Sequence, residues 1–338
     1  MTHEINELFQ TLKAWQQAGK KAVLASVVAL EGTSYRRPGV RMIIGEDGNS
    51  VGAVSGGCVE NEIERQAQTV FKTGRSKVMT YDGRFRVGCD GILYLLIEPV
   101  FIPMELFNDF DSQLKNRHPF KLDTYYYHDV GEYDNLGTHI TVNDKIFSLN
   151  PSFNPGEVND QLCFSQSLDP LFRLYIFGAE HDAVKLSKAA KELGWNVTIV
   201  ASSDESKSCE YFTGASSLIT PSFQEIDTSV FDDHTAVVLM THSYNKDVQY
   251  LMALKDSKPA YIGLLGSVSR RERVLSMLLE YCPDISTDFL DQIHGPAGIN
   301  LGAESASEIA VSIVAEILSV IRHQEPKSLK DKTGSIHG

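Results

Sequence analysis

Residues 171–177, with the sequence LFRLYIF, form an apolar run of the kind that fills a central strand of a parallel sheet. A turn at Gly178 follows, a helical pattern then continues to Leu193, and residues 196–200 suit a second strand. Parallel neighbours need such a crossover connection, so this order limits the fold more than any other feature. It predicts a doubly wound α/β domain in the second half of the chain.

The segments that follow continue this alternation. Further apolar stretches of strand length occur at 217–220, 236–240 and 260–262. The last helix begins with Ser305 and Glu308 at the spacing of a capping box. We therefore expect a Rossmann-like, doubly wound parallel-sheet domain over residues 169–325.

The first half predicts a smaller α/β domain over residues 1–105. A helical pattern covers 5–18, and strand patterns cover 21–30, 40–44 and a stretch from about residue 51. Between them and the second domain, residues 106–168 suggest a β-rich segment that bridges the two. Residues 326–338 are expected to form a disordered tail.

Composition excludes several classes of function. The formal net charge of −13 argues against nucleic acid as a partner, because phosphate backbones require a basic surface. No apolar run is long enough to span a bilayer, and the first residues lack the pattern of a signal peptide. The five cysteines contain no CxxC pair, which speaks against a zinc ribbon or a disulfide framework. We expect a cytoplasmic protein with reduced thiols and no membrane partner.

A glycine–cysteine turn is the main candidate site in the first half. Ser55, Gly56, Gly57 and Cys58 stand between a short strand pattern and a helical one. Unpaired N–H groups at a helix start attract anions, and glycines let an anion approach the backbone. The partial positive charge at a helix start also favours a thiolate over a thiol, and a thiolate is both a nucleophile and a soft metal ligand. The alternative is that Cys58 is a small buried side chain, as many free cysteines are.

Two arginines precede this turn. Arg36 and Arg37 lie in a loop at a strand end, where they would bind a phosphate or carboxylate, or would remain solvated surface charges. Arg41, in the next strand, joins this candidate set. Cys89 is flanked by glycines and is a second candidate thiol, which either faces Cys58 across a cleft or packs in a β-bulge.

Candidate ligand residues in the second half follow its strands, where doubly wound sheets bind their ligands. They are Gly178, His181, His242, Gly266 and Arg270. A glycine turn with arginines in the next helical turn can hold an anion. A histidine there can donate to a ligand or act in acid–base chemistry, although a single loop histidine is more often structural.

The dinucleotide-binding fingerprint is incomplete in this half. Glu180 stands where the second glycine should let the backbone reach a pyrophosphate. Ala201 stands where an acidic residue usually ends the second strand to bind the ribose. Both differences argue against NAD(P) as a cofactor.

Several segments together resemble one known family. They are PGVRM, SGGCVE, GCDG, IFGAEHDA, THSYNKD, YIGLLGS and GPAGINLGAESASEIAVSIVAEI, and they occur in this order along most of the chain. They resemble the XdhC/CoxI family. The resemblance implies a small N-terminal domain, a C-terminal Rossmann domain, and binding of molybdenum cofactor as molybdopterin or its nucleotide form. It also implies that Cys58 is the residue tied to the cofactor, as a ligand of its molybdenum.

The function implied by the resemblance is that of an accessory protein rather than a catalyst. Family members assist cofactor sulfuration and insertion into xanthine dehydrogenase, an enzyme of purine catabolism. Expected partners are such an apoenzyme, a cysteine desulfurase, and a second copy in a homodimer. The chain lacks the cysteine clusters of iron–sulfur centres, so it is not the dehydrogenase itself. Two alternatives stay open, an NAD(P)-dependent oxidoreductase and a thiol redox protein that uses Cys58 and Cys89.

Overall fold

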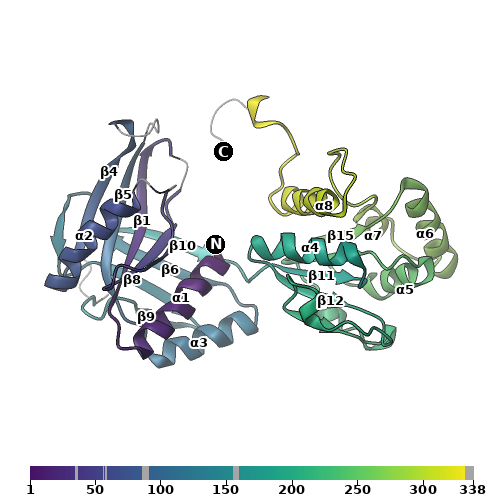
Figure 1. Ribbon diagram of the computed structural model, residues 1–338, viewed down its shortest axis with the longest axis horizontal. Coiled ribbons are helices and arrows are strands. Elements are labelled where there is room, and N and C mark those ends of the chain that lie inside the picture. The colour runs from purple at the N-terminus through teal and green to yellow at the C-terminus, as the bar shows by residue number, and fades with distance from the viewer. Residues whose placement is uncertain (35–36, 56, 58, 86–90, 155–159, 332–338) are drawn as a thin grey trace. The chain divides into compact units, whose positions relative to one another are not determined.

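The computed structural model describes residues 1–338 except 35–36, 56, 58, 86–90, 155–159 and 332–338. The chain forms two compact units, unit 1 at Met1–Pro170 and unit 2 at Leu171–Gly338 (Figure 1). Over the described ranges, every helix is too short or too polar to cross a bilayer.

Unit 1 is built on an antiparallel sheet with the strand order β3-β2-β1-β5-β4-β7. Its strands are β1 (Ala22–Gly32), β2 (Arg41–Gly45), β3 (Ser50–Gly52), β4 (Ser76–Asp82), β5 (Gly91–Val100) and β7 (Gly131–Tyr133). Helix α2 (Glu60–Thr73) covers one face, where its Ile63, Ala67 and Val70 pack on alternate residues of the strands. The strands expected at 21–30 and 40–44 are thereby confirmed.

A second antiparallel sheet packs against the opposite face of the first. Its order is β10-β6-β8-β9, with β6 (Phe120–Tyr126), β8 (Gly137–Val142), β9 (Lys145–Ser148) and β10 (Leu162–Leu168). Helices α1 (Thr2–Gln17) and α3 (Met104–Lys115) complete the same core. In this core Leu24 and Ile43 of the first sheet meet Ile140 of the second and Phe110 of α3.

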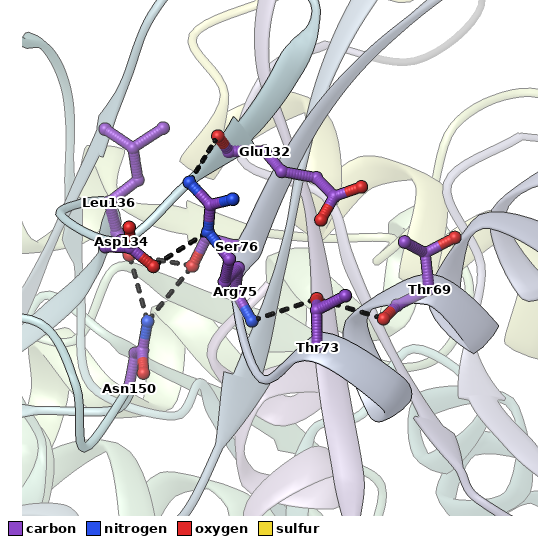
Figure 2. A network of polar contacts seen from close by, with 8 residues as sticks. All are labelled: Thr69, Thr73, Arg75, Ser76, Glu132, Asp134, Leu136 and Asn150. Atoms are coloured by element: carbon purple, nitrogen blue, oxygen red, sulfur yellow. Dashed lines mark hydrogen bonds and ion pairs between the residues drawn. The ribbon is translucent and has the colours of Figure 1, made fainter.

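The segment 106–168 is part of unit 1, and our expectation of a bridge between domains is wrong in this respect. Strand β7 pairs with β4, and Arg75 Nε donates to Asp134 Oδ1 at 2.8 Å. The Ser76 hydroxyl donates to the carbonyl of Leu136 at 2.9 Å. The side-chain amide of Asn150 donates to the Ser76 hydroxyl oxygen and to the Leu136 carbonyl, each at 3.0 Å (Figure 2). Pairing between strands far apart in sequence leaves no local pattern, so the sequence does not reveal it.

Unit 2 contains a parallel sheet with the order β13-β12-β11-β14-β15-β16. The strands are β11 (Arg173–Phe177), β12 (Asn196–Val200), β13 (Ser217–Ile219), β14 (Thr235–Leu239), β15 (Tyr261–Leu264) and β16 (Ile293–His294). This is a doubly wound order: from β11 to β13 successive strands are added toward one edge of the sheet, and from β14 to β16 they are added toward the other edge. The expected fold class is confirmed.

Helices cover both faces of this sheet. On one face lie α4 (His181–Glu192) and α8 (Ala306–Ile321), and on the other α5 (Tyr244–Leu254), α6 (Val268–Tyr281) and α7 (Thr287–Asp291) (Figure 1). The capping box predicted at Ser305 and Glu308 forms at the start of α8. The stretch 326–338, which we expected to be disordered, contains a 3-10 turn at Leu329–Asp331.

Candidate functional site

Two loops of unit 1 that carry candidate residues leave the first sheet at the same end. The loop with Arg37 enters β2 at Arg41, and the glycine turn leaves β3 at Gly52, which lies opposite Met42. Four candidate residues lie outside the described residues, namely Arg36, Gly56, Cys58 and Cys89. The described neighbours of Arg36, Gly56 and Cys58 therefore place the arginine loop and the glycine turn at one end of adjacent strands.

The glycine turn is held by a carboxylate that the sequence analysis did not assign. Glu60, the first residue of α2, accepts the backbone N–H groups of Val54 at 3.1 Å and Ser55 at 2.7 Å. Its second oxygen accepts the Gly57 N–H at 3.0 Å and the Ser55 hydroxyl at 2.6 Å. Val59, like Val54, is buried and packs under the turn. One side chain thus fixes both halves of the turn.

This contact changes what the turn can bind. Partial burial acts to raise the pKa of Glu60, but the hydrogen bonds from Ser55 and Gly57 outweigh it and leave the pKa below its ordinary value. The ionised carboxylate therefore already occupies the amides that we expected to hold a phosphate. Gly57 itself is exposed, and a Cβ there would meet no described atom within 4 Å, so a ligand can approach its open side.

The two described arginines of this region differ. Arg37 is exposed, as a residue that meets a ligand should be. Arg41 is only 6% exposed, and its guanidinium donates to the carbonyl of Gly39 at 2.9 Å and to the side chain of Gln166. Its position on β2 turns it toward the second sheet, so Arg41 is an internal residue and its expected contact with a ligand finds no support in its geometry.

Behind Arg41 lies a row of buried polar groups between the two sheets. Arg41 Nη2 donates to Thr124 Oγ1 at 3.4 Å, which lies 3.1 Å from Thr138 Oγ1. Thr138 donates its hydroxyl and its N–H to Glu98 at 2.5 and 2.9 Å. Burial raises the pKa of Glu98 to about 7 and lowers that of Arg41 to about 10. We name Arg41, Thr124, Thr138 and Glu98 the polar seam.

The described neighbours of the two candidate cysteines lie at different levels of the sheet. Gly91, which follows the segment with Cys89, pairs with Gly32 near the end of β1. The glycine turn begins after Gly52, which pairs with Met42, and Met42 in turn pairs with Ala25 near the start of β1. At about 3.3 Å per residue, these levels differ by roughly 20 Å along β1. The described neighbours of the two cysteines therefore lend no support to a Cys58–Cys89 thiol pair.

In unit 2 the loops after β11, β14 and β15 meet at the carboxyl end of the sheet. The N–H of Met240 donates to the carbonyl of Phe177 at 2.8 Å, and that of Leu265 to Leu239 at 2.9 Å. Gly178 has φ +133°, and a Cβ on it would lie 2.4 Å from the carbonyl oxygen of Met240. Only glycine permits this approach, and the expected ligand-binding edge is thus formed by closely packed loops.

The two histidine candidates lie on neighbouring loops of this edge. His181 is exposed and begins α4, and His242 follows β14 with a φ of +56°, a conformation that few non-glycine residues adopt. His242 Nε2 lies 3.8 Å from Asp182 Oδ2. This pair joins the loop after β14 to the first turn of α4 at the surface.

The remaining candidates, Gly266 and Arg270, lie at the start of α6. Gly266 has φ +134°, and Arg270 Nη2 contacts the buried Asp247 Oδ2 at 2.5 Å. Thr241 donates to the other oxygen of Asp247 at 2.6 Å, and the ring of Tyr244 lies 4.5 Å from the Arg270 guanidinium carbon. The charge of Arg270 is therefore largely balanced inside unit 2.

The first helix start of unit 2 is acidic. Glu180 is the exposed N-cap of α4 and makes no capping hydrogen bond, and Asp182 follows in the first turn. A dinucleotide would place its pyrophosphate at this end, where two carboxylates oppose it. Ala201 is buried at the end of β12, where the acid that binds ribose is expected. The geometry agrees with the sequence argument against NAD(P).

Sequence reasoning missed three residues that shape these sites, Glu60, Gln166 and Asp247. Glu60 stands five residues after Ser55, outside the three-residue spacing of a capping box, so no standard pattern signals it. Gln166 accepts a hydrogen bond from Arg41, and Asp247 accepts one from Arg270. Each pair is distant in sequence, so no local pattern predicts the contact.

Comparison with protein families gives two matches on this chain. A model described as the XdhC and CoxI family matches residues 15–82, and one described as the XdhC Rossmann domain matches residues 174–317. The first match includes the glycine turn, and the second includes the loops at the carboxyl edge of unit 2.

Relatives align over nearly the whole chain. A Bacillus subtilis protein, named as a probable subunit of xanthine dehydrogenase, is 29% identical, with 91% of this chain and 95% of the relative covered. The Escherichia coli molybdenum cofactor insertion chaperone PaoD is 28% identical, with 92% and 87% covered. A crystal structure from Bacillus halodurans, described as a xanthine dehydrogenase, superposes with a TM-score of 0.76 at 25% identity, covering 94% and 96%.

Proposed function

Because the chain belongs to the XdhC and CoxI family, we propose that it binds molybdenum cofactor and delivers it to a molybdenum hydroxylase apoenzyme. Support comes from PaoD, which is named an insertion chaperone for this cofactor, and from the Bacillus subtilis relative, whose name associates it with xanthine dehydrogenase. In this proposal the protein assists sulfuration and insertion of the cofactor and catalyses no step of purine breakdown itself.

The observation that carries the proposal is the glycine turn held by Glu60. The carboxylate fixes Ser55 and Gly57, the neighbours of Gly56 in the sequence, and Cys58 is the next residue in the sequence, two residues before α2 begins at Glu60. A turn fixed from below and open above Gly57 suits a large ligand that approaches the backbone. The Ser55 hydroxyl is engaged by Glu60, so it shapes the turn rather than contacting the ligand.

The residues of this region suit the cofactor chemically. When bound, the cofactor supplies a soft, sulfur-coordinated metal and an anionic phosphate. The thiolate of Cys58 would hold the metal side, because thiolates select soft metals. Arg36 and Arg37 would neutralise the phosphate, since Glu60 already takes the turn amides. Cys89 is proposed as a separate thiol rather than as a partner of Cys58, because its described neighbour Gly91 pairs with Gly32, far along β1 from the glycine turn.

Unit 2 is proposed to bind a ligand group at its own carboxyl edge through the exposed His181 and His242, with Gly178 and Gly266 shaping the loops and Arg270, balanced by Asp247, fixing the start of α6. The convergence of three loops at the carboxyl edge supports this assignment. The proposed partners are a xanthine dehydrogenase-type apoenzyme, a cysteine desulfurase that supplies sulfur, and a second copy of the chain.

The test is pterin content after purification without oxygen from a molybdenum-replete host. We expect wild-type protein to carry about one pterin per chain, and Cys58→Ser to lose affinity by roughly tenfold or more. Cys163→Ser is the matched control, because Cys163 is an exposed free thiol on β10, and it should retain pterin.

Several results would contradict the proposal. Equal affinity in wild type and Cys58→Ser would remove Cys58 from the site. Absence of pterin in both, even after reconstitution with free cofactor, would reject the carrier function. Tight NADH binding by calorimetry would then favour an oxidoreductase, and a reversible Cys58–Cys89 bond by mass spectrometry would favour a thiol redox protein.

A further inference from the structure

The arginine loop of unit 1 is bound from its inner side by a buried guanidinium. Arg41 donates to the carbonyl of Gly39 at 2.9 Å, and Gly39 lies only two residues after the exposed Arg37. The same Nη1 atom donates to Gln166 Oε1. The guanidinium of Arg41 therefore connects the backbone near Arg37 to the second sheet.

Gly39 is enclosed from other sides as well. It has φ +101°, and a Cβ on it would lie 2.6 Å from Gln166 Nε2. Its N–H donates to the carbonyl of Val27 at 2.8 Å, and the N–H of Val27 donates to Val40 at 3.0 Å. The backbone behind Arg37 is thus fixed by β1, by the Arg41 guanidinium and by the Gln166 side chain of β10.

The guanidinium is itself oriented by the polar seam. Thr124 accepts from Arg41 at 3.4 Å, and Thr138 connects Thr124 to the buried Glu98. These groups come from β6, β8 and β5, so three further strands set the direction in which Arg41 points. The described residues 37–40, which lead into β2, therefore have little conformational freedom left to lose when Arg37 meets a ligand.

We infer that Arg41 and Gln166 are positioning residues, which hold the arginine loop so that Arg37 is ready for the anionic group of the ligand. This inference rests on the proposed function, in which Arg37 neutralises the phosphate of the cofactor. A loop that is ordered before binding increases affinity, because the conformational entropy of the loop is not lost again when the ligand binds.

A purely structural role for Gln166 makes a different prediction. If Gln166 only stabilised the contact between the sheets, its loss would lower cofactor affinity by the same factor whether or not Arg37 is present. If it acts through the arginine loop, its effect should depend on Arg37. A double-mutant cycle separates the two cases.

The experiment uses the full chain and molybdopterin released from a purified molybdoenzyme as the probe. We expect Gln166→Leu to weaken binding about tenfold, because it removes a hydrogen bond to a charged group. In the Arg37→Ala background the same change should have less than about a twofold effect. Gln166→Glu, which keeps an acceptor for Arg41, should bind like wild type.

Ser167→Leu is the matched control, because Ser167 is the exposed next residue of β10 and should leave affinity unchanged. Circular dichroism and thermal melting establish that each variant is folded. Equal losses in both Arg37 backgrounds, or no loss in Gln166→Leu while wild type binds, would overturn this inference and leave the proposed function intact. Failure of wild type to bind would overturn both.

Discussion

Among the described residues, Arg41 of unit 1 and Arg270 of unit 2 both point inward toward a buried carboxylate, and the two pairs are built differently. In unit 2, Arg270 contacts the buried Asp247 directly at 2.5 Å. In unit 1, Arg41 reaches Glu98 only through the hydroxyls of Thr124 and Thr138. The direct pair joins the first turns of two helices, and the relayed pair joins two sheets.

The difference shows how an arginine near a glycine turn should be interpreted. Arg41 and Arg270 both follow glycine-rich loops, and both were expected to meet a ligand. Both turn inward, because each has a distant acceptor inside its own unit. Arg37 remains exposed at the surface. Exposure, rather than position after a glycine loop, is therefore the feature that marks an arginine available to a ligand.

The largest expected effect concerns the direct pair. Asp247→Leu leaves the Arg270 charge inside unit 2 without its carboxylate, and we expect the free energy of unfolding of unit 2 to fall by about 3–5 kcal/mol. Urea unfolding would be followed by Trp195 fluorescence in a Trp15→Phe background, since these two tryptophans lie in different units. The exposed Asp256→Asn is the control, and a loss below about 1 kcal/mol would show that the pair is not an internal one.

The relayed pair predicts a pH dependence confined to unit 1. Burial raises the pKa of Glu98 to about 7 from an ordinary 4.5, so the folded state holds the proton more tightly than the unfolded state. The resulting stabilisation is complete below about pH 4.5 and is lost as the pH rises through 7. Relative to Glu98→Gln, wild type should lose about 2–3 kcal/mol of unfolding free energy between pH 5 and pH 8.

This second prediction is measured by Trp15 fluorescence in a Trp195→Phe background, at closely spaced pH values. Unit 2, reported by Trp195, serves as the internal control, and its stability should not depend on the identity of residue 98. Parallel stability curves for wild type and Glu98→Gln would show that the seam does not titrate near neutral pH, and the contrast between the two pairs would then disappear.

The smallest expected effect concerns the glycine turn. Glu60→Ala frees the N–H groups of Val54, Ser55 and Gly57, and we expect unit 1 to lose about 1–2 kcal/mol of unfolding free energy. Millimolar phosphate should restore part of this loss in the variant by binding to the freed amides, and should leave wild type unchanged. Glu64→Ala, one turn later in α2, is the control. Equal phosphate effects in both variants would show that Glu60 does not occupy an anion site.

Local patterns were sufficient for most elements and for the architecture of unit 2. The strand expected at 196–200 forms as β12, and the capping box at Ser305 starts α8, because both depend on residues adjacent in sequence. Parallel strands buried on both faces also produce long apolar runs, which made β11 evident. The family resemblance, carried by short motifs, was confirmed.

The side-chain roles could not be predicted in the same way. Arg41 is 125 residues from Gln166 and 83 from Thr124, and nothing near residue 41 indicates that it will be buried. The place of 106–168 in unit 1 likewise depends on β7 pairing with β4 and on Asn150 reaching Ser76. The sequence indicated the glycine turn only as a candidate site, and it did not indicate that the carboxylate of Glu60 already occupies the amides of the turn.

The contact between Arg41 and Gln166 also sets an order of events during synthesis on the ribosome. At roughly 5–20 residues per second, the 125 residues that separate the two take about 6–25 s to emerge. Until then, Gly39 lacks the Gln166 side chain that encloses it, and Arg41 lacks one of its two acceptors in the second sheet. The enclosure of Gly39 is therefore completed only near the end of the translation of unit 1, when β10 has joined the second sheet.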